Sequence, residues 1–336
     1  MGQTRKVAVL GGGSFGTAMA TLLARNKASL EVVLLLRDVA TCRSVNERHV
    51  NERYLKQYTL PDNVRATTDA ADAFQGADYI VHAVPVQQST AFLTGLRHLI
   101  PAGTPILCLS KGLEVGTCRN MSEIIHDALG REQPLAVLSG PTFAVEIMQG
   151  LPTAIVAAST DPQLALRVQR LYASSNLRVN TSGDVIGVEV AGALKNVLAI
   201  AAGIVEGLEL GNNAMAALVA QGCSEIRWLA ERMGADPVTL SGLSGVGDIM
   251  LTCFVPLSRN RTVGVRLGKG ESLAAILASS TQVAEGVATA SAVVLLARRH
   301  RVALPVLTAV ARILDGELGP REAVDAVMSL PQRPEV

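Results

Sequence analysis

A lysine inside an apolar segment is the chemically most unusual feature of the sequence. Lys195 and Asn196 lie within residues 190–199, where nearly every other side chain is apolar, so a helix here would bury the lysine. Burial removes water from the ammonium group and favours the neutral amine, unless a carboxylate lies nearby. Such a lysine suits proton exchange near neutral pH. The structural alternative is a lysine that reaches solvent or pairs with Glu189.

A carboxylate and a basic cluster follow in the second half of the chain. Residues 243–248 form a glycine-rich stretch, predicted as a turn, that ends on Asp248, a candidate partner for a lysine. Ser258 is predicted to cap a helix whose first turn holds Arg259 and Asn260. Free amides, the helix dipole and a guanidinium together attract a phosphate. The alternative is a capped surface helix with solvated arginines.

A glycine-rich pattern near the start indicates dinucleotide binding. Residues 11–16 read Gly-Gly-Gly-Ser-Phe-Gly, which matches G-x-G-x-x-G, between a predicted strand at Val7–Leu10 and a predicted helix from about Thr17 to Arg25. The first glycine allows a tight turn, the second lets backbone approach a pyrophosphate, and the third lets the helix pack on the strand. The alternative is a purely structural strand–turn–helix.

The end of the second predicted strand bears on cofactor choice. The apolar run Val32–Leu36 is followed by Arg37 and Asp38. An arginine at this edge can meet a 2′-phosphate, whereas NAD-specific proteins place an acid there. We therefore expect NADP(H) to be accepted and, because Asp38 is adjacent, NAD(H) as well. The alternative is a solvated Arg37 beside an Asp38 that caps the next helix.

Two loops after later strands are further candidates for ligand contact. Lys111 follows the predicted strand Ile106–Leu109, and residues 139–144 follow the strand Ala136–Leu138. The carboxyl ends of parallel strands line the ligand crevice of a doubly wound sheet. Lys111 is therefore well placed to meet an anion, and the small residues of the second loop let backbone approach a ligand. The alternative for each is an ordinary surface turn.

The elements that must position these residues change in character near residue 183. Before it, apolar runs alternate with helical patterns, which predicts a Rossmann-type, doubly wound, mostly parallel sheet. The predicted strands are Val7–Leu10, Val32–Leu36, Tyr79–Val84, Ile106–Leu109, Ala136–Leu138, Ala154–Ala157 and Arg178–Asn180, the last two flanking a helix at Pro162–Tyr172. After it, nearly everything reads as helix, with Asp184 as an N-cap. We expect an α/β dinucleotide-binding domain at residues 1–182 and an all-helical substrate-binding domain at residues 183–336.

Composition excludes several other classes of protein. The 336 residues carry a formal net charge of +1, so there is no broad positive field for nucleic acid. Five cysteines without a Cys-x-x-Cys pair indicate free thiols, and no His/Cys set suggests a metal site. The longest apolar stretch, Val185–Val205, contains Glu189 and Lys195, which favours a buried helix over a membrane span.

Taken together, the motifs resemble the NAD(P)-dependent glycerol-3-phosphate dehydrogenase family. The matching segments are Gly11–Gly16, Leu109–Gly112, Gly192–Asn196, Ser258–Arg261 and the pair Gly247-Asp248, and the likeness runs from Val7 to about Leu330. In residues 82–87 and 221–228 the sequence most resembles the plastid forms of plants and algae. The likeness implies reversible hydride transfer between NAD(P)H and dihydroxyacetone phosphate, giving sn-glycerol 3-phosphate for glycerolipid and glycerophospholipid synthesis. It also implies the chloroplast stroma, although no transit peptide is present in the sequence; the alternative is the cytoplasm.

The resemblance also implies the role of each site residue. Lys195 would be the catalytic proton donor in reduction and the acceptor in oxidation. The other substrate-binding residues would be Lys111, Gly140, Thr142, Asn196, Asp248, Thr252, Ser258, Arg259 and Asn260, the last three at the phosphate. The cofactor would contact Gly11, Gly13, Ser14, Phe15, Gly16, Arg37, Lys111, Ala144, Arg259, Val283 and Glu285. Phe15 departs from the Trp or Tyr of many bacterial members. No metal is implied.

Other functions and partners complete the expectations. We expect a small-molecule substrate, no nucleic acid and no membrane span, and we leave a homodimer open. A β-hydroxyacid dehydrogenase of similar build would need a carboxylate site in place of the phosphate site. A non-catalytic NADP(H) sensor would keep Gly11–Gly16 but would not need Lys195 in an apolar helix.

Overall fold

The computed structural model describes residues 4–280 and 282–331 of the chain. These divide into two compact units, the first formed by Met1–Lys111 and Arg119–Glu189 and the second by residues 112–118 and Val190–Val336. The chain therefore leaves the first unit after Lys111, returns to it at Arg119 and leaves it again after Glu189. The boundary predicted at residues 182 and 183 lies just before helix α8, through which the second crossing passes.

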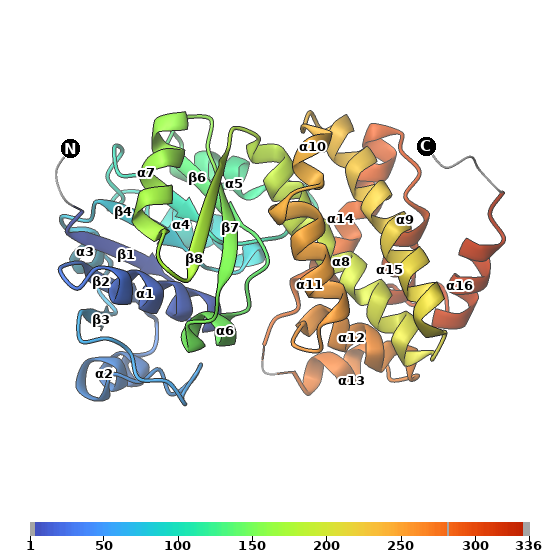
Figure 1. Ribbon diagram of the computed structural model, residues 1–336, viewed down its shortest axis with the longest axis horizontal. Helices are drawn as coiled ribbons and strands as arrows, with labels where there is room; N and C mark the ends of the chain where they lie inside the picture. Colours follow the sequence, from blue (N-terminus) through green and yellow to red (C-terminus); the bar gives the residue numbers. More distant parts are fainter. Residues whose placement is uncertain (1–3, 281, 332–336) are drawn as a thin grey trace. The chain divides into compact units, whose positions relative to one another are not determined.

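A sheet of eight strands forms the centre of the first unit (Figure 1). The strands are β1 (Lys6–Leu10), β2 (Glu31–Leu35), β3 (Val64–Thr67), β4 (Tyr79–His82), β5 (Ile106–Cys108), β6 (Leu135–Ser139), β7 (Thr153–Ala158) and β8 (Leu177–Ser182). Their spatial order is β3-β2-β1-β4-β5-β6-β7-β8, and every neighbouring pair is parallel except β6 and β7. The predicted doubly wound, mostly parallel sheet is confirmed. All five residues of β1 are buried, as expected for a strand covered on both faces.

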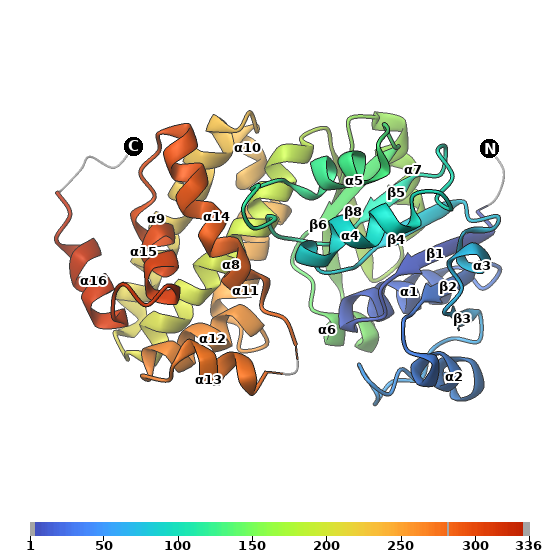
Figure 2. The same cartoon turned by 180° about the vertical axis from the view of Figure 1, so that it is seen from behind.

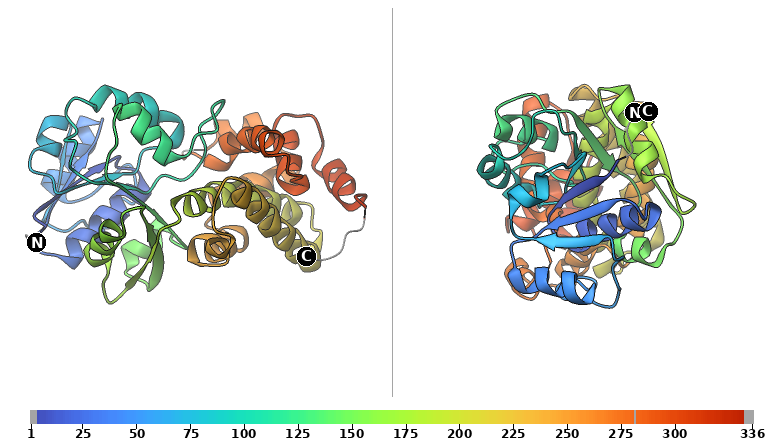
Figure 3. Two further views of the ribbon diagram at one scale, coloured as in Figure 1. Left: turned by 90° about the horizontal axis from the view of Figure 1, so that it is seen from above. Right: turned by 90° about the vertical axis from the view of Figure 1, so that its left-hand side faces the viewer.

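Helices cover the two faces of this sheet, as the left-hand view of Figure 3 shows for α4 and α5 on one face and α1 and α7 on the other. They are α1 (Ser14–Asn26), α2 (Val39–Arg48), α3 (Ala70–Phe74), α4 (Val86–Leu96), α5 (Met121–Leu129), α6 (Ala144–Gln149) and α7 (Pro162–Tyr172). Helix α7 has the predicted bounds, with Pro162 in its first turn and the Asp161 carboxylate accepting from the Gln163 amide at 2.8 Å. Helix α1 begins at Ser14 rather than near Thr17, because Gly13 is its N-cap.

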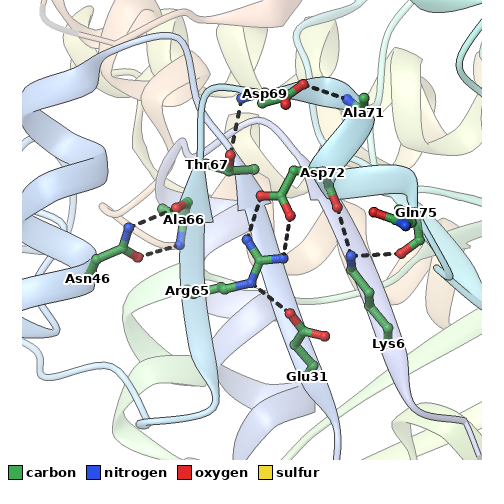
Figure 4. A network of polar contacts seen from close by, with 10 residues as sticks. All are labelled: Lys6, Glu31, Asn46, Arg65, Ala66, Thr67, Asp69, Ala71, Asp72 and Gln75. Carbon is green, nitrogen blue, oxygen red and sulfur yellow. Dashed lines mark hydrogen bonds and ion pairs between the residues drawn. The ribbon is translucent and has the colours of Figure 1, made fainter.

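A polar network holds the edge of the sheet where β1 and β2 begin (Figure 4). The Arg65 guanidinium donates to Asp72 at 2.7 and 2.9 Å and to Glu31 at 2.6 Å. Lys6, which is 9% exposed, donates from Nζ to two backbone carbonyls, of Asp72 and Gln75, at 2.8 Å each. We call this group the amino-end network. Arg65 is paired with two carboxylates and Lys6 is bonded to backbone carbonyls, and the network lies at the opposite ends of the strands from the predicted ligand crevice.

The second unit is helical (Figure 2), and the residues of α8 (Val185–Gly207) from Val190 onward belong to its core. The remaining helices are α9 (Gly211–Arg232), α10 (Pro237–Leu240), α11 (Asp248–Phe254), α12 (Arg259–Gly268), α13 (Leu273–Ala278), α14 (Glu285–His300), α15 (Pro305–Leu314) and α16 (Pro320–Met328). Helix α8 and the segment Pro237–Phe254 are long and apolar enough to cross a membrane by length and composition. Within the protein, 89% of the α8 segment is buried, as in the core helix that the sequence predicts.

Glycines bring α8 and α12 into backbone contact. A Cβ atom at Gly203 would lie 2.1 Å from the carbonyl oxygen of Arg261, and one at Gly264 would lie 2.0 Å from that of Ile200. Gly207 has the same relation to α12, at 2.3 Å from the Val265 oxygen. Side chains at these positions would push the helices apart, so the glycines fix the distance between α8, which carries Lys195, and the start of α12.

The glycine-rich residues 243–247 differ from their prediction as a turn. They form a single π-helical turn, closed by a bond from the Gly247 amide to the Gly242 carbonyl at 3.1 Å, and they continue directly into α11. The turn is closely packed at Gly245, where a Cβ would lie 2.0 Å from the Leu240 oxygen. Asp248 is therefore the first residue of a helix, and it is 1% exposed.

Candidate active site

The glycine turn of the first unit has the shape that dinucleotide binding requires. Gly11 has a φ of +99°, and a Cβ there would lie 2.8 Å from the Ala83 oxygen. A Cβ on Gly16 would lie 2.2 Å from the Gly11 oxygen, so helix α1 packs on the turn only with glycine at this position. Around Gly13, by contrast, no atom beyond its neighbours in the chain lies within 4 Å of a Cβ position. The turn therefore presents open backbone at the start of a helix, which fits the pyrophosphate of NAD(H) or NADP(H). Ser14 and Phe15 are the first two residues of that helix.

Asn51 supports this turn from a distant part of the chain. Its side chain is 1% exposed, and Nδ2 donates to the Gly12 carbonyl at 2.9 Å and to the Thr17 hydroxyl at 2.8 Å. Both bonds hold the glycine turn in one conformation. Sequence reasoning missed Asn51, because it lies 39 residues from Gly12 and no local pattern marks it.

The end of β2 shows how Arg37 and Asp38 are placed. Asp38 is the N-cap of α2: its carboxylate accepts from the Thr41 amide at 3.0 Å and from the Thr41 hydroxyl. These hydrogen bonds, led by that of the hydroxyl, lower the pKa of Asp38 below its ordinary value. Asp38 thus takes the capping role that the sequence offered as an alternative. Arg37 is exposed at the carboxyl end of β2, and its contact with a cofactor stays a prediction.

The loops after β5 and β6 come together at the carboxyl ends of the strands. Lys111 Nζ donates to the Gly140 carbonyl at 3.3 Å, and the Thr142 hydroxyl donates to the same oxygen at 3.1 Å. Gly140 itself packs against β7, since a Cβ there would lie 2.8 Å from the Ala154 oxygen. The structure therefore brings Lys111, Gly140 and Thr142 together, as the sequence predicts, and Ala144 begins α6 shortly after them.

A buried histidine, not singled out from the sequence, joins two of these loops. The Ser110 hydroxyl donates to the Val84 carbonyl at 2.6 Å, so its oxygen accepts from His82 Nδ1 at 3.1 Å. Complete burial lowers the pKa of His82 to about 4, which keeps the ring neutral at physiological pH. The pair links the loop after β4 to the loop that carries Lys111.

In the second unit, the buried lysine lies beside the carboxylate that the sequence suggested. Lys195 Nζ is 2.6 Å from Asp248 Oδ1 and 2.9 Å from Thr252 Oγ1. The Thr252 hydroxyl donates to the Asp248 carbonyl at 2.6 Å, so its oxygen is turned toward the lysine. With exposures of 8% for Lys195 and 1% for Asp248, the carboxylate compensates for lost hydration and favours the charged ammonium.

Glu189, the structural alternative as a partner for Lys195, has a different function. Its carboxylate accepts from the Ser122 amide at 2.8 Å and from the Ser122 hydroxyl at 2.6 Å, in the first turn of α5. Burial raises the pKa of Glu189 to about 7, although the two bonds from Ser122 act in the opposite direction. Glu189 therefore joins the start of α8 to α5 within the first unit.

The start of α12 has the capped form expected of a phosphate site. The Ser258 hydroxyl oxygen accepts from the Arg261 amide at 3.2 Å, which confirms Ser258 as the N-cap. Arg259 is exposed, whereas Ser258 and Asn260 are buried. Asn260 Nδ2 donates to Asn196 Oδ1 at 3.0 Å, so two of the predicted substrate residues touch each other.

Val283 and Glu285 lie at the start of α14. Val283 is 51% exposed and lines a hollow of about 400 Å³ together with residues of α13 and α14, among them Leu277 and Val287. Glu285 is the first residue of α14. Their contact with the cofactor stays a prediction, as do the roles of the other site residues.

The predicted residues thus gather at two places, one in each unit. The carboxyl edge of the first sheet holds Gly11, Gly13, Ser14, Phe15, Gly16, Arg37, Lys111, Gly140, Thr142 and Ala144. The second unit holds Lys195, Asn196, Asp248, Thr252, Ser258, Arg259, Asn260, Val283 and Glu285. Among residues 4–280 and 282–331, no group of three or more His, Cys, Asp or Glu side chains is placed to hold a metal ion.

Comparison with known proteins gives a consistent result along the chain. Residues 6–165 match the family model for the N-terminus of NAD-dependent glycerol-3-phosphate dehydrogenase, and residues 184–325 match that for its C-terminus. The chain is 64% identical over 334 residues to a chloroplastic glycerol-3-phosphate dehydrogenase [NAD(+)] of Oryza sativa subsp. japonica, covering 99% of this chain and 76% of the relative. It is 45% identical over 333 residues to a glycerol-3-phosphate dehydrogenase [NAD(P)+] of Anaeromyxobacter dehalogenans, covering 98% and 100%. The crystal structure of glycerol-3-phosphate dehydrogenase from Coxiella burnetii superposes with a TM-score of 0.92 at 36% identity, covering 97% of this chain and 99% of that one.

Proposed function

Because the chain belongs to the NAD-dependent glycerol-3-phosphate dehydrogenase family, we propose that Lys195 is its acid–base residue. The activity is the reversible reduction of dihydroxyacetone phosphate to sn-glycerol 3-phosphate by NAD(P)H. The observation that carries the proposal is the buried triad in which Lys195 Nζ lies 2.6 Å from Asp248 and 2.9 Å from Thr252. In this triad Lys195 is the proton donor, and the oxygens of Asp248 and Thr252 accept hydrogen bonds from its Nζ.

The proton chemistry follows from this geometry. As the carbonyl of the substrate is reduced, negative charge grows on its oxygen, and the ammonium of Lys195 stabilises that charge and then donates the proton. The carboxylate of Asp248 pairs with the ammonium, and the Thr252 oxygen, as a second acceptor, helps to fix the direction of Nζ. In the oxidative direction the same nitrogen accepts the proton.

The first unit is proposed to bind the NAD(P)H cofactor. The nicotinamide group supplies the hydride when the cofactor is bound. Gly11, Gly13 and Gly16 present the backbone cradle for its pyrophosphate, and the exposed Arg37 supports a contact with the 2′-phosphate of NADP(H). We therefore propose that both NADP(H) and NAD(H) are accepted.

The substrate phosphate is assigned to the start of α12. The positive end of the helix dipole, the Ser258 hydroxyl and the Arg259 guanidinium are the right groups for a dianion. Remote binding energy from this phosphate would orient the reacting end of the substrate. The carboxyl-end loop with Lys111, Gly140 and Thr142 is proposed to contribute from the first unit.

A turnover assay tests the function directly. Purified protein should oxidise NADPH in the presence of dihydroxyacetone phosphate and should act very poorly on unphosphorylated dihydroxyacetone. Turnover of a β-hydroxyacid in place of dihydroxyacetone phosphate would indicate the related dehydrogenase class. NADPH binding with no turnover of either substrate would indicate a sensor and contradict the proposal.

The relatives also support a location. Two plant relatives, each 64% identical, are named chloroplastic, so we propose the chloroplast stroma and a supply of glycerol 3-phosphate to glycerolipid synthesis there. Imaging of the native gene product fused to a fluorescent protein tests the compartment. The homodimer left open by the sequence is tested by light scattering of the purified protein.

A further inference from the structure

A buried, hydrogen-bonded pair of side chains joins the end of β4 to the loop that follows β5. His82, the last residue of β4, is fully buried, and its Nδ1 lies 3.1 Å from the Ser110 hydroxyl oxygen. The same hydroxyl donates to the Val84 carbonyl at 2.6 Å, so Ser110 is bonded to residues on both sides of Ala83. We call His82 and Ser110 the histidine–serine pair.

The positions of the protons in this pair follow from the partners. A carbonyl oxygen only accepts, so the single proton of the Ser110 hydroxyl points to Val84. The hydroxyl oxygen then accepts from His82, whose ring proton must lie on Nδ1. Within residues 4–280 and 282–331, the buried Nε2 atom of His82 has no hydrogen-bond partner. The ring therefore uses one nitrogen, and that nitrogen faces the loop that carries Lys111.

The loop after β4 also packs against the glycine turn. The Ala83 amide donates to the Leu10 carbonyl at 2.9 Å, at the end of β1. A Cβ on Gly11 would lie 2.8 Å from the Ala83 oxygen, and one on Gly16 would lie 3.1 Å from the Ala83 Cβ. Ala83 is therefore in close contact with the turn proposed to hold the pyrophosphate, and both of its neighbours in the chain are bonded to Ser110.

On its other side, the histidine–serine pair leads directly to Lys111. This residue follows Ser110 in the chain, and its Nζ donates to the Gly140 carbonyl at 3.3 Å. A continuous series of contacts thus runs from the glycine turn through Ala83 and Ser110 to Lys111. A shift of Ser110 would move the lysine relative to the turn, because only one peptide bond separates the two residues.

We propose that His82 and Ser110 are positioning residues, which hold Lys111 at a fixed distance from the glycine turn so that it meets the anionic substrate beside the bound cofactor. The inference rests on the proposed function, in which Lys111 contacts the substrate. A histidine needed only for packing would act through the volume of its ring. A positioning histidine acts through the N–H group at Nδ1, so the two roles respond to different replacements.

Two replacements of His82 in the full chain separate these roles. His82→Leu fills the site but removes the Nδ1 donor and the unpartnered Nε2, so the melting temperature should stay within about 3 °C of wild type. With saturating NADPH, its kcat/KM for dihydroxyacetone phosphate should fall by about threefold to tenfold, the range for one uncharged hydrogen bond. His82→Asn places an amide N–H where Nδ1 lies but leaves a cavity. Its melting temperature should fall, while kcat/KM stays within about twofold of wild type.

A double-mutant cycle tests whether the effect passes through Lys111. Lys111→Met should lower kcat/KM by about tenfold to a hundredfold, as expected for a hydrogen bond between charged groups. The double variant with His82→Leu should match Lys111→Met within about twofold, since no lysine is left to position. Ser110→Ala should lower kcat/KM at least as much as His82→Leu. Its matched control is Ser159→Ala, which removes a hydroxyl bond of 2.7 Å to the Leu135 carbonyl at the amino-terminal end of β6 and should leave kcat/KM unchanged.

The proton position gives an independent measurement. Nuclear magnetic resonance of labelled histidine ring nitrogens should show His82 protonated on Nδ1, and a proton on Nε2 would overturn the inference. Effects of His82→Leu and Lys111→Met that multiply would also overturn it, as would a His82→Asn protein with the same loss of kcat/KM as His82→Leu. A lower melting temperature of His82→Leu with unchanged kcat/KM would assign the ring to packing alone. A wild type without turnover of dihydroxyacetone phosphate would instead overturn the proposed function.

Discussion

The glycine turn of the first unit and the Lys195 cluster of the second are both suited to polar ligands, yet they consist of different groups. The turn offers backbone amides and open space, since no atom beyond its neighbours in the chain lies within 4 Å of a Cβ on Gly13. The cluster offers charged side chains held away from water, with Lys195 and Asp248 8% and 1% exposed. One site depends on the absence of side chains and the other on paired charges. Replacing a glycine by a larger residue should therefore impair folding or cofactor binding at the turn. Replacing a charged side chain by a neutral one should impair the activity of the cluster.

The largest effect is expected at Lys195. Lys195→Met keeps an unbranched side chain of similar size but removes the proton and the positive charge, so kcat should fall by about two orders of magnitude or more while NADPH still binds. The rate of NADPH oxidation measures this. Lys6→Met is the matched control, since Lys6 is 9% exposed and belongs to the amino-end network. It should lower the melting temperature and leave kcat of the folded protein unchanged. A folded Lys195→Met protein with normal kcat would refute the acid–base role.

A smaller loss is expected at the predicted phosphate site. Arg259→Ala should raise KM for dihydroxyacetone phosphate by roughly tenfold to a hundredfold, the range for a hydrogen bond between charged groups. Arg266→Ala is the control on the same helix, where the guanidinium pairs with Glu271 in solvent and should not affect KM. If unphosphorylated dihydroxyacetone lost activity by the same factor, Arg259 would act on the cofactor or the fold.

A third effect concerns the stability of the protein as the pH changes. Burial raises the pKa of Glu189 to about 7 from an ordinary 4.5, so its contribution to stability is complete below pH 4.5 and is lost as the pH rises through 7. Between pH 5 and pH 8 the wild type should lose up to about 3 kcal/mol of unfolding free energy relative to Glu189→Gln. Denaturant titrations at both pH values measure it.

The comparison with Glu189→Gln is needed because His82 acts in the opposite direction. Burial lowers the pKa of His82 to about 4 from 6.5, so its contribution is complete above pH 6.5 and is lost as the pH falls through 4. His82 is present in both proteins and cancels in their difference. Parallel pH profiles for the two proteins would contradict the role of Glu189.

The glycine turn should respond to added atoms in two ways. Gly16→Ala places a Cβ 2.2 Å from the Gly11 oxygen and should destabilise the protein by about 1–3 kcal/mol. Gly13→Ala meets nothing beyond its neighbours in the chain within 4 Å, so its stability should change by less than about 0.5 kcal/mol, while its Kd for NADPH should rise because the methyl group occupies the approach of the pyrophosphate. Equal stability losses would show that the turn is packed differently.

The smallest effect is expected at Arg37, because its side chain is exposed. Arg37→Ala should weaken NADPH binding by about 1 kcal/mol, the lower end for a charge-assisted bond in solvent, and should affect NADH less. Fluorescence titration with each cofactor measures both. Equal losses would mean that Arg37 does not distinguish the 2′-phosphate.

The difference between the glycine turn and the Lys195 cluster also shows which features can be predicted from the sequence. The glycine turn, helix α7 and the Ser258 cap depend on residues a few positions apart, and a local pattern is enough to identify them. Lys195 is recognisable because a charge in an apolar helix needs a partner, and Asp248 is the candidate at the end of the glycine-rich stretch, 53 residues further on. The stretch 243–247 looked like a turn only because glycine content does not distinguish a turn from a closely packed π-helical turn.

Other parts of the site have no local pattern. Asn51 reaches Gly12 across 39 residues, and Glu189 reaches Ser122 across 67. In the sequence these are an ordinary asparagine and an ordinary helical glutamate, because their significance comes from the partner that the fold supplies.

The excursion of residues 112–118 into the second unit has a consequence for synthesis of the protein. Leu113 and Cys118, 0% and 3% exposed, belong to the second core; the Leu113 amide bonds to the Thr289 hydroxyl, 176 residues later. At ribosomal speeds of about 5–20 residues per second, this loop waits roughly 10–35 s for its partners to be made. During that time the apolar side chains of the loop stay exposed, because the second core that buries them has not yet been synthesised. An mRNA truncated before the codon for Thr289 should therefore yield a polypeptide that exposes this apolar loop. Chaperones should bind that polypeptide even when all strands of the sheet have been synthesised.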